Sequence, residues 1–154
     1  MKKKSKYRPK GLLINPLQYV LESLKPVKHH DSYLIDLKIK NHGAMDALTK
    51  GVAVRSDMDV LINMVNVVEA LYRLGFGEDY GAEIRQGLDA LHAVGSRGIE
   101  TGRFILKAHE MSHLNLVMEL HDAQMEVITV KDMERAVDLV NKEFDQRKMR
   151  RMKA

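Results

Sequence analysis

Apolar residues recur at intervals of three and four positions along almost the whole of this 154-residue chain. This spacing gathers them on one side of an α-helix, whereas a half-buried strand alternates apolar and polar residues. The β-branched runs fall inside helical periods, and no two segments have the pattern of a hairpin. The sequence therefore predicts an all-α protein, a single compact bundle of five to six helices.

Proline, glycine and capping side chains divide the pattern into segments. The expected helices cover residues 15–25, 31–50, 56–74, 79–94, 103–128 and a last helix from 129 onward. Asp31 or Ser32 is the expected cap of the second helix. Thr129 and Asp132 form a capping box before the last helix, and the segment GSRGIETG (95–102) interrupts the pattern between the fourth and fifth.

The expected fifth helix, 103–128, is apolar around most of its circumference. A helix of this kind usually lies in the interior of a protein. We therefore expect residues 111–125 at the centre of the bundle, with Met118 buried.

The last helix carries a different pattern, a narrow apolar seam with three-four spacing. Its members are Val130, Met133, Val137, Val140 and Phe144. Such a seam is typical of antiparallel or coiled-coil-like packing. Together with the apolar fifth helix it indicates more hydrophobic surface than one copy covers, and so a homodimer or a tight protein partner.

Composition limits the class of protein. There is no cysteine, which excludes a disulfide framework and thiolate chemistry. No apolar run approaches the roughly 20 residues of a membrane span. The stretch GLLI after the basic N-terminus is too short for a signal-peptide core. We expect a cytoplasmic protein with no membrane contact and no cofactor.

Charge is distributed unevenly along the chain. Residues 1–10 contain six of the 25 basic residues and residues 147–154 contain five, and neither segment contains an acid. The remaining 14 basic and 21 acidic residues give residues 11–146 a net charge of −7. The sequence thus predicts an acidic helical domain, 11–146, between a basic N-terminal arm, 1–10, and a basic C-terminal tail, 147–154, both expected to be flexible.

Basic terminal segments of this kind are an electrostatic footprint for nucleic acid. Tyr7 adds an aromatic ring that can stack on a base. The candidate nucleic-acid-binding residues are Lys2, Lys3, Lys4, Lys6, Tyr7, Arg8, Lys10, Arg147, Lys148, Arg150, Arg151 and Lys153. No helix pair has a recognition-helix pattern, so contacts to the phosphate backbone of DNA or RNA are expected. Solubilising tails, or arms that pair with the acidic domain of a second copy, are the alternatives.

The segment KAHEMSH contains His109-Glu110-x-x-His113, the spacing by which many zinc hydrolases hold their metal. In this minority interpretation His109 and His113 bind zinc and Glu110 acts as the general base on the bound water. No third ligand has a spacing that identifies it, since Leu116 and Glu119 stand where a longer zinc motif has glycine and histidine. We expect no metal site and no catalytic residue here.

A di-iron arrangement is a second metal hypothesis. Two carboxylate-x-x-His pairs and two further glutamates resemble the ligand set of di-iron helical bundles. The residues concerned are Asp89, His92, Glu110, His113, Glu69 and Glu134. Solvated carboxylates and ordinary histidines account for them more simply.

The segments DLKIKNHGAM, EALYRLGFG and MELHDAQMEVITVKDMERA resemble small helical proteins encoded by temperate phages and prophages of proteobacteria. The similarity extends over most of the chain from Arg8 onward. The resemblance implies no catalytic residues. It implies an accessory protein that binds phage or host nucleic acid, or an inhibitor or adaptor that binds a host protein through the acidic helical domain.

Overall fold

The computed structural model describes residue 21 and residues 23–153, with side chains described for all of these except 31 and 148–153. Five α-helices make up most of this part of the chain, and none of it forms a strand. They are α2 (Asp31–Thr49), α3 (Arg55–Arg73), α4 (Gly81–Thr101), α5 (Ala108–Val127) and α6 (Val130–Lys153), with 3-10 turns η1 (Val27–His29) and η2 (Glu78–Tyr80). The expected all-α fold is confirmed. Most of the first expected helix, 15–25, lies outside the described residues.

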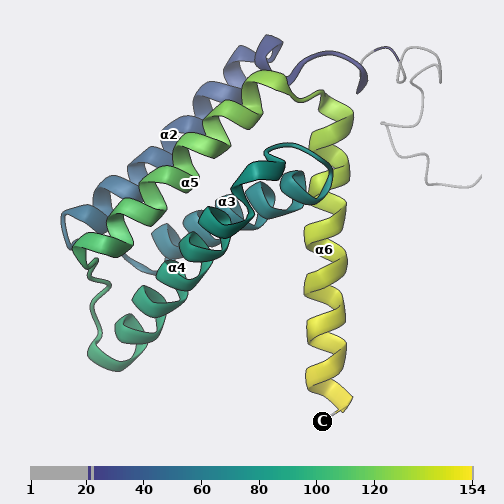
Figure 1. Cartoon of the computed structure of the whole chain (residues 1–154). Helices are drawn as coiled ribbons and strands as arrows, with labels where there is room; N and C mark the ends of the chain where they lie inside the picture. The colour runs from purple at the N-terminus through teal and green to yellow at the C-terminus, as the bar shows by residue number, and fades with distance from the viewer. Residues whose placement is uncertain (1–20, 22, 154) are drawn as a thin grey trace, which may run out of the picture.

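The central position in the bundle belongs to α3, which contacts α2, α4, α5 and α6. Its buried face follows the three-four spacing of its apolar residues, with Leu61, Val65, Val68 and Leu71 fully buried. Figure 1 shows α2 and α5 running side by side, with α4 beside α3 and α6 crossing at a steep angle. The expectation that the helix at 111–125 is central was wrong in this respect.

The helix α5 is buried on one side only. Leu114, Val117, Met118 and Met125 are buried against α2, α3 and α4, so the expected burial of Met118 is confirmed. The opposite side includes exposed Leu116 and Val127, because no described element packs over it. An apolar circumference therefore does not by itself show that a helix is surrounded by other helices.

The boundary between α4 and α5 differs from the expected one. The helix α4 continues through Gly95 and Gly98 to Thr101, and α5 begins at Ala108 instead of near residue 103. A Cβ at Gly98 would lie 2.0 Å from Cδ1 of Phe104, so the glycine makes room for a ring that packs back onto α4. The helix ends at Gly102, whose φ of 77° is a left-handed conformation that glycine adopts without strain.

The start of α6 is fixed as the sequence predicts. The backbone N–H of Thr129 donates to Oδ2 of Asp132 at 2.9 Å, and the N–H of Asp132 donates to Oγ1 of Thr129 at 3.2 Å. This capping box is confirmed. By contrast, α2 begins earlier than expected, because Asp31 and Ser32 lie within the helix and its N-cap residue is His30, which forms no side-chain cap hydrogen bond.

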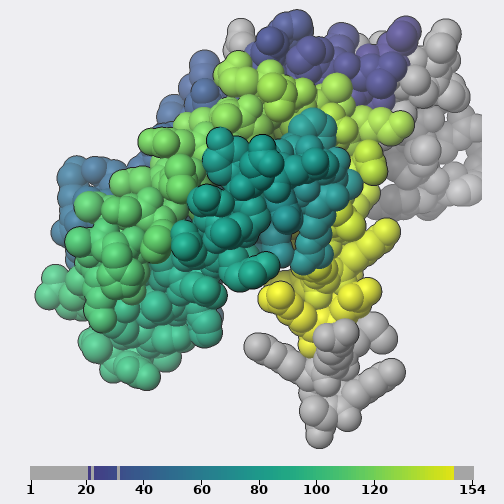
Figure 2. Space-filling view, viewed as in Figure 1, coloured from purple at the N-terminus to yellow at the C-terminus, as the bar shows by residue number. Residues whose placement is uncertain are grey.

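Beyond its first half, α6 leaves the rest of the bundle. Met133 and Ala136 are buried in a small core with Ala70 and Leu71 of α3. Arg73 then forms an ion pair with Glu143, and the following residues 144–147 are all exposed. Figure 1 shows the C-terminal part of α6 standing clear of the other helices, and Figure 2 shows the described side chains of α6, in yellow, at one edge of this face of the molecule. The expected tail, from residue 147, therefore begins inside a helix that continues to Lys153.

None of the helices in the described part of the chain combines the length and the apolar character needed to cross a lipid bilayer.

Candidate functional site

The predicted nucleic-acid-binding residues fall into two groups. Lys2, Lys3, Lys4, Lys6, Tyr7, Arg8 and Lys10 lie outside the described residues. Of the C-terminal group, Arg147 is exposed on α6, and the backbone continues as helix from there to Lys153. The five basic residues of this segment are thus carried on the projecting end of one helix (Figure 1).

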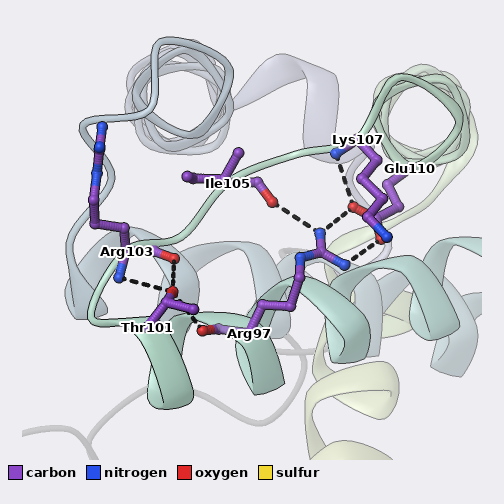
Figure 3. A network of polar contacts seen from close by, with 6 residues as sticks. All are labelled: Arg97, Thr101, Arg103, Ile105, Lys107 and Glu110. Carbon is purple, nitrogen blue, oxygen red and sulfur yellow. Dashed lines mark hydrogen bonds and ion pairs between the residues drawn. The ribbon is translucent and has the colours of Figure 1, made fainter.

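The zinc-type motif lies at the first turns of α5, and its glutamate, Glu110, forms an ion pair with an arginine of α4. Arg97 of α4 donates from Nη1 to Oε1 of Glu110 at 2.8 Å and from Nη2 to Oε2. The same carboxylate accepts the backbone N–H of Lys107 at 2.9 Å, which caps the start of α5. Figure 3 shows Arg97 reaching from α4 to this carboxylate across the loop that joins the two helices.

The network holds the whole loop from Gly102 to Lys107. Nη2 of Arg97 also donates to the carbonyl oxygen of Ile105 at 2.8 Å, and the Thr101 hydroxyl donates to the carbonyl of Arg97 at 2.7 Å. The paired guanidinium lowers the pKa of Glu110 below its usual value, assisted by the Lys107 N–H and opposed by burial. A carboxylate with a lowered pKa is a weak base. Glu110 therefore has the environment of a structural ion pair and not that of a general base.

The two histidines of the motif stand at the side of this ion pair. The rings of His109 and His113 are 6.3 Å apart between centroids and meet edge to face. His109 is exposed and His113 is half-buried, so neither ring is enclosed in the core. They border a shallow hollow of about 250 Å³ whose lining is completed by Gln86, Asp89, Ala90, Ala93 and Glu110.

A metal ion needs at least one further ligand at this hollow. Asp89 is the acidic residue that α4 contributes to it, while Glu110 is held by Arg97. Among the described residues no three His, Asp or Glu side chains are grouped so that they could hold a metal ion. The di-iron set is dispersed as well, because Glu69 pairs with Arg73 at 2.9 Å and Glu134 lies on α6.

One buried polar residue was not foreseen, His121 of α5, which lies beside two polar side chains that are more exposed. His121 is 1% exposed, and its Nδ1 lies 3.6 Å from Oδ1 of Asp122. Asp122 in turn is hydrogen-bonded at 3.0 Å to Nε2 of His42 on α2. The signal was present in the periodicity, because His121 follows Leu114 and Met118 by seven and three positions on the buried side of α5.

Burial makes His121 a source of pH-dependent stability. Desolvation lowers its pKa below the usual 6.5, although Asp122 acts in the opposite direction. As the pH falls through about 6.5 the unfolded chain takes up a proton before the folded one, so folding stability is lost from there down to the folded pKa. We expect the free energy of unfolding, measured in urea, to decrease from pH 7 to pH 5, and this decrease to be smaller in His121→Gln.

The matched control for this measurement is His92→Gln, since His92 is exposed on α4. It should keep the pH dependence of the natural chain. An unchanged pH dependence in His121→Gln would show that this histidine titrates alike in both states.

No family model, curated protein or solved structure matches this chain. Its function is therefore inferred from its own residues and their arrangement.

Proposed function

We propose that this chain is a non-enzymatic accessory protein of the phage type that binds nucleic acid electrostatically through its basic terminal segments. The observation that carries the proposal is the projecting end of α6. Five basic residues occupy positions 147–153 of a helix whose last part stands clear of the bundle. A helix end that carries clustered cations and stands clear of the bundle can approach a phosphate backbone without rearrangement of the other helices.

The charge of the rest of the protein supports contacts at these ends and not over the helical domain. Residues 11–146 contain 21 acids against 14 basic residues, which repels phosphates from most of the surface. Contacts of this kind address the backbone, so the proposal includes little preference for base sequence. The test compares DNA and RNA as ligands.

The enzymatic alternative, a zinc-dependent hydrolase at His109 and His113, has less support. The reaction needs a carboxylate free to accept a proton from the metal-bound water. Both oxygens of Glu110 are engaged by Arg97, and one of them also caps α5.

The test is the salt dependence of binding, measured by fluorescence anisotropy with a labelled 20-base-pair duplex and a single-stranded RNA. If about four to seven of the eleven terminal cations contact phosphates, log affinity should fall with log salt at a slope of about −0.9 per contact on duplex DNA. Affinity should then decrease by orders of magnitude between dilute buffer and physiological salt. Deleting residues 2–10 should remove roughly half of the slope.

A variant with Lys148, Arg150, Arg151 and Lys153 replaced by Gln should remove most of the other half. His113→Ala is the control and should leave affinity and slope unchanged. If neither terminal change alters the affinity, the segments are solubilising tails and the nucleic-acid proposal fails. A protein complex that survives high salt and loss of both segments would favour recognition of a host protein by the acidic domain.

A further inference from the structure

An apolar edge of α6 runs out of the bundle, since Val130 packs against the small core whereas Val137 and Phe144 are exposed. Val130, Val137 and Phe144 are spaced by seven residues, which places them on one side of the helix, next to the face that packs on α3. Val137 is 40% exposed and Phe144 is 68% exposed. Apolar side chains aligned in this way at the edge of a packed face are a feature of helix–helix interfaces.

The same edge borders a groove between α6 and the start of α2. The groove has a volume of about 450 Å³ and an apolar lining that includes Val27, Tyr33, Met133 and Val137. Tyr33 itself is 48% exposed. The apolar surface thus continues from the edge of α6 onto the bundle, where another helix could pack.

Charge along α6 indicates what packs there. Residues 130–141 contain three acids, Asp132, Glu134 and Asp138, and two basic residues, whereas residues 142–153 contain two acids and six basic residues. Glu134 and Asp138 line the groove, and Arg147 is exposed. Glu134 and Arg147 are equally far from the midpoint between Val140 and Asn141, and so are Val137 and Phe144. A helix with this arrangement is complementary to a second copy of itself in the reverse direction.

We propose that two copies of this chain associate through antiparallel α6 helices related by a twofold axis near Val140 and Asn141. Each Val137 then packs against the partner's Phe144, and each Glu134 lies beside the partner's Arg147. Parallel pairing would place like charges together at both ends and is disfavoured. In this dimer the four basic residues after Arg147 of each copy lie at the ends of the paired helices and take no part in the contacts named above. The dimer can therefore form whether or not these residues bind nucleic acid.

The oligomeric state tests whether the apolar edge of α6 is a dimer interface. Sedimentation equilibrium of the full chain is expected to give a dimer at micromolar concentration. Phe144→Glu should weaken association by at least about 100-fold, since it places a charge in the apolar centre of the interface. Circular dichroism should be unchanged, because the side chain is exposed in one copy. The matched control is Ile99→Glu on α4, where the natural side chain is 85% exposed, and this variant should remain dimeric.

Charge reversal tests the antiparallel register. Glu134→Arg and Arg147→Glu should each weaken the dimer, and the double variant should recover most of the lost affinity. The absence of cysteine allows a direct check as well. The variant with Val137→Cys and Phe144→Cys should form disulfide-linked dimers under mild oxidation, and Ile99→Cys should not.

A chain that is monomeric at about 100 µM would overturn the proposal. So would a dimer that Phe144→Glu leaves intact, or one that the paired cysteines fail to link. If the chain is a monomer and deleting residues 2–20 increases the labelling of Val137→Cys by a thiol reagent, the N-terminal segment covers the edge instead.

Discussion

Met118→Asp should leave the protein largely unfolded at room temperature. Met118 is 4% exposed and belongs to the main core with Met45, Leu114 and Val117. The substitution places a carboxylate among these apolar side chains and also removes most of the volume of methionine. The two effects together should cost more than about 4 kcal/mol, a large part of the stability of a domain of this size.

The measurement is thermal and urea unfolding followed by circular dichroism. Met118→Leu, which conserves volume, should cost less than about 1.5 kcal/mol. Asn115→Asp adds the same charge to an exposed position of α5 and should change stability by less than about 0.5 kcal/mol. A well-folded Met118→Asp protein would mean that this side of α5 is open to water.

Arg97→Leu should have the second largest effect, a loss of about 3 kcal/mol measured by urea unfolding at pH 7. The side chain of Glu110 is 4% exposed, and without Arg97 its charge would stay buried beside the capped N–H of Lys107. The carbonyl of Ile105 would also lose its donor. Adding Glu110→Gln to Arg97→Leu should recover part of the loss, because the buried group is then neutral.

The pH dependence separates this explanation from simple loss of packing. In the natural chain the pKa of Glu110 is lowered, so the stabilisation is present above the carboxyl pKa of the unfolded chain, about 4.3, and is lost as the pH falls toward the folded value. In Arg97→Leu the buried, unpaired carboxyl has a raised pKa, and protonation relieves the penalty. The difference between the two proteins should shrink as the pH falls below about 5. Arg85→Leu, at an exposed position of α4, is the control and should show no such difference.

Features fixed by neighbouring residues were predictable from the sequence. The box of Thr129 and Asp132 spans three residues, so its geometry depends little on the rest of the fold. The end of α4 was not predictable in the same way. In the sequence, Gly98 indicates the end of a helix, whereas in the structure it lies inside α4 and leaves space for the ring of Phe104. That contact depends on how the loop after α4 folds back onto the helix, which the sequence does not show.

The candidate zinc site shows the same division. The spacing of His109, Glu110 and His113 is local and was read correctly as one turn of helix. The partner that determines the chemistry of Glu110 is Arg97, on the preceding helix, and charge patterning does not identify it. Likewise, the choice of α3 over α5 as the central helix depends on how α6 crosses the bundle.

The length of α6 determines how strongly the acidic domain acts on the basic end that it carries. From Glu143, which is held by Arg73, to Lys153 the helix advances roughly 15 Å at about 1.5 Å per residue. Ionic screening in physiological salt acts over about 8 Å, so the attraction of the acidic domain for Lys153 is largely suppressed there, whereas Arg147, about 6 Å along the helix from Glu143, stays within its reach. In very dilute buffer the screening length reaches about 30 Å, and the acidic domain then competes for the same cations. The projecting half of α6 is therefore an electrostatic spacer, which frees its last basic residues from the acidic domain when the salt concentration is physiological.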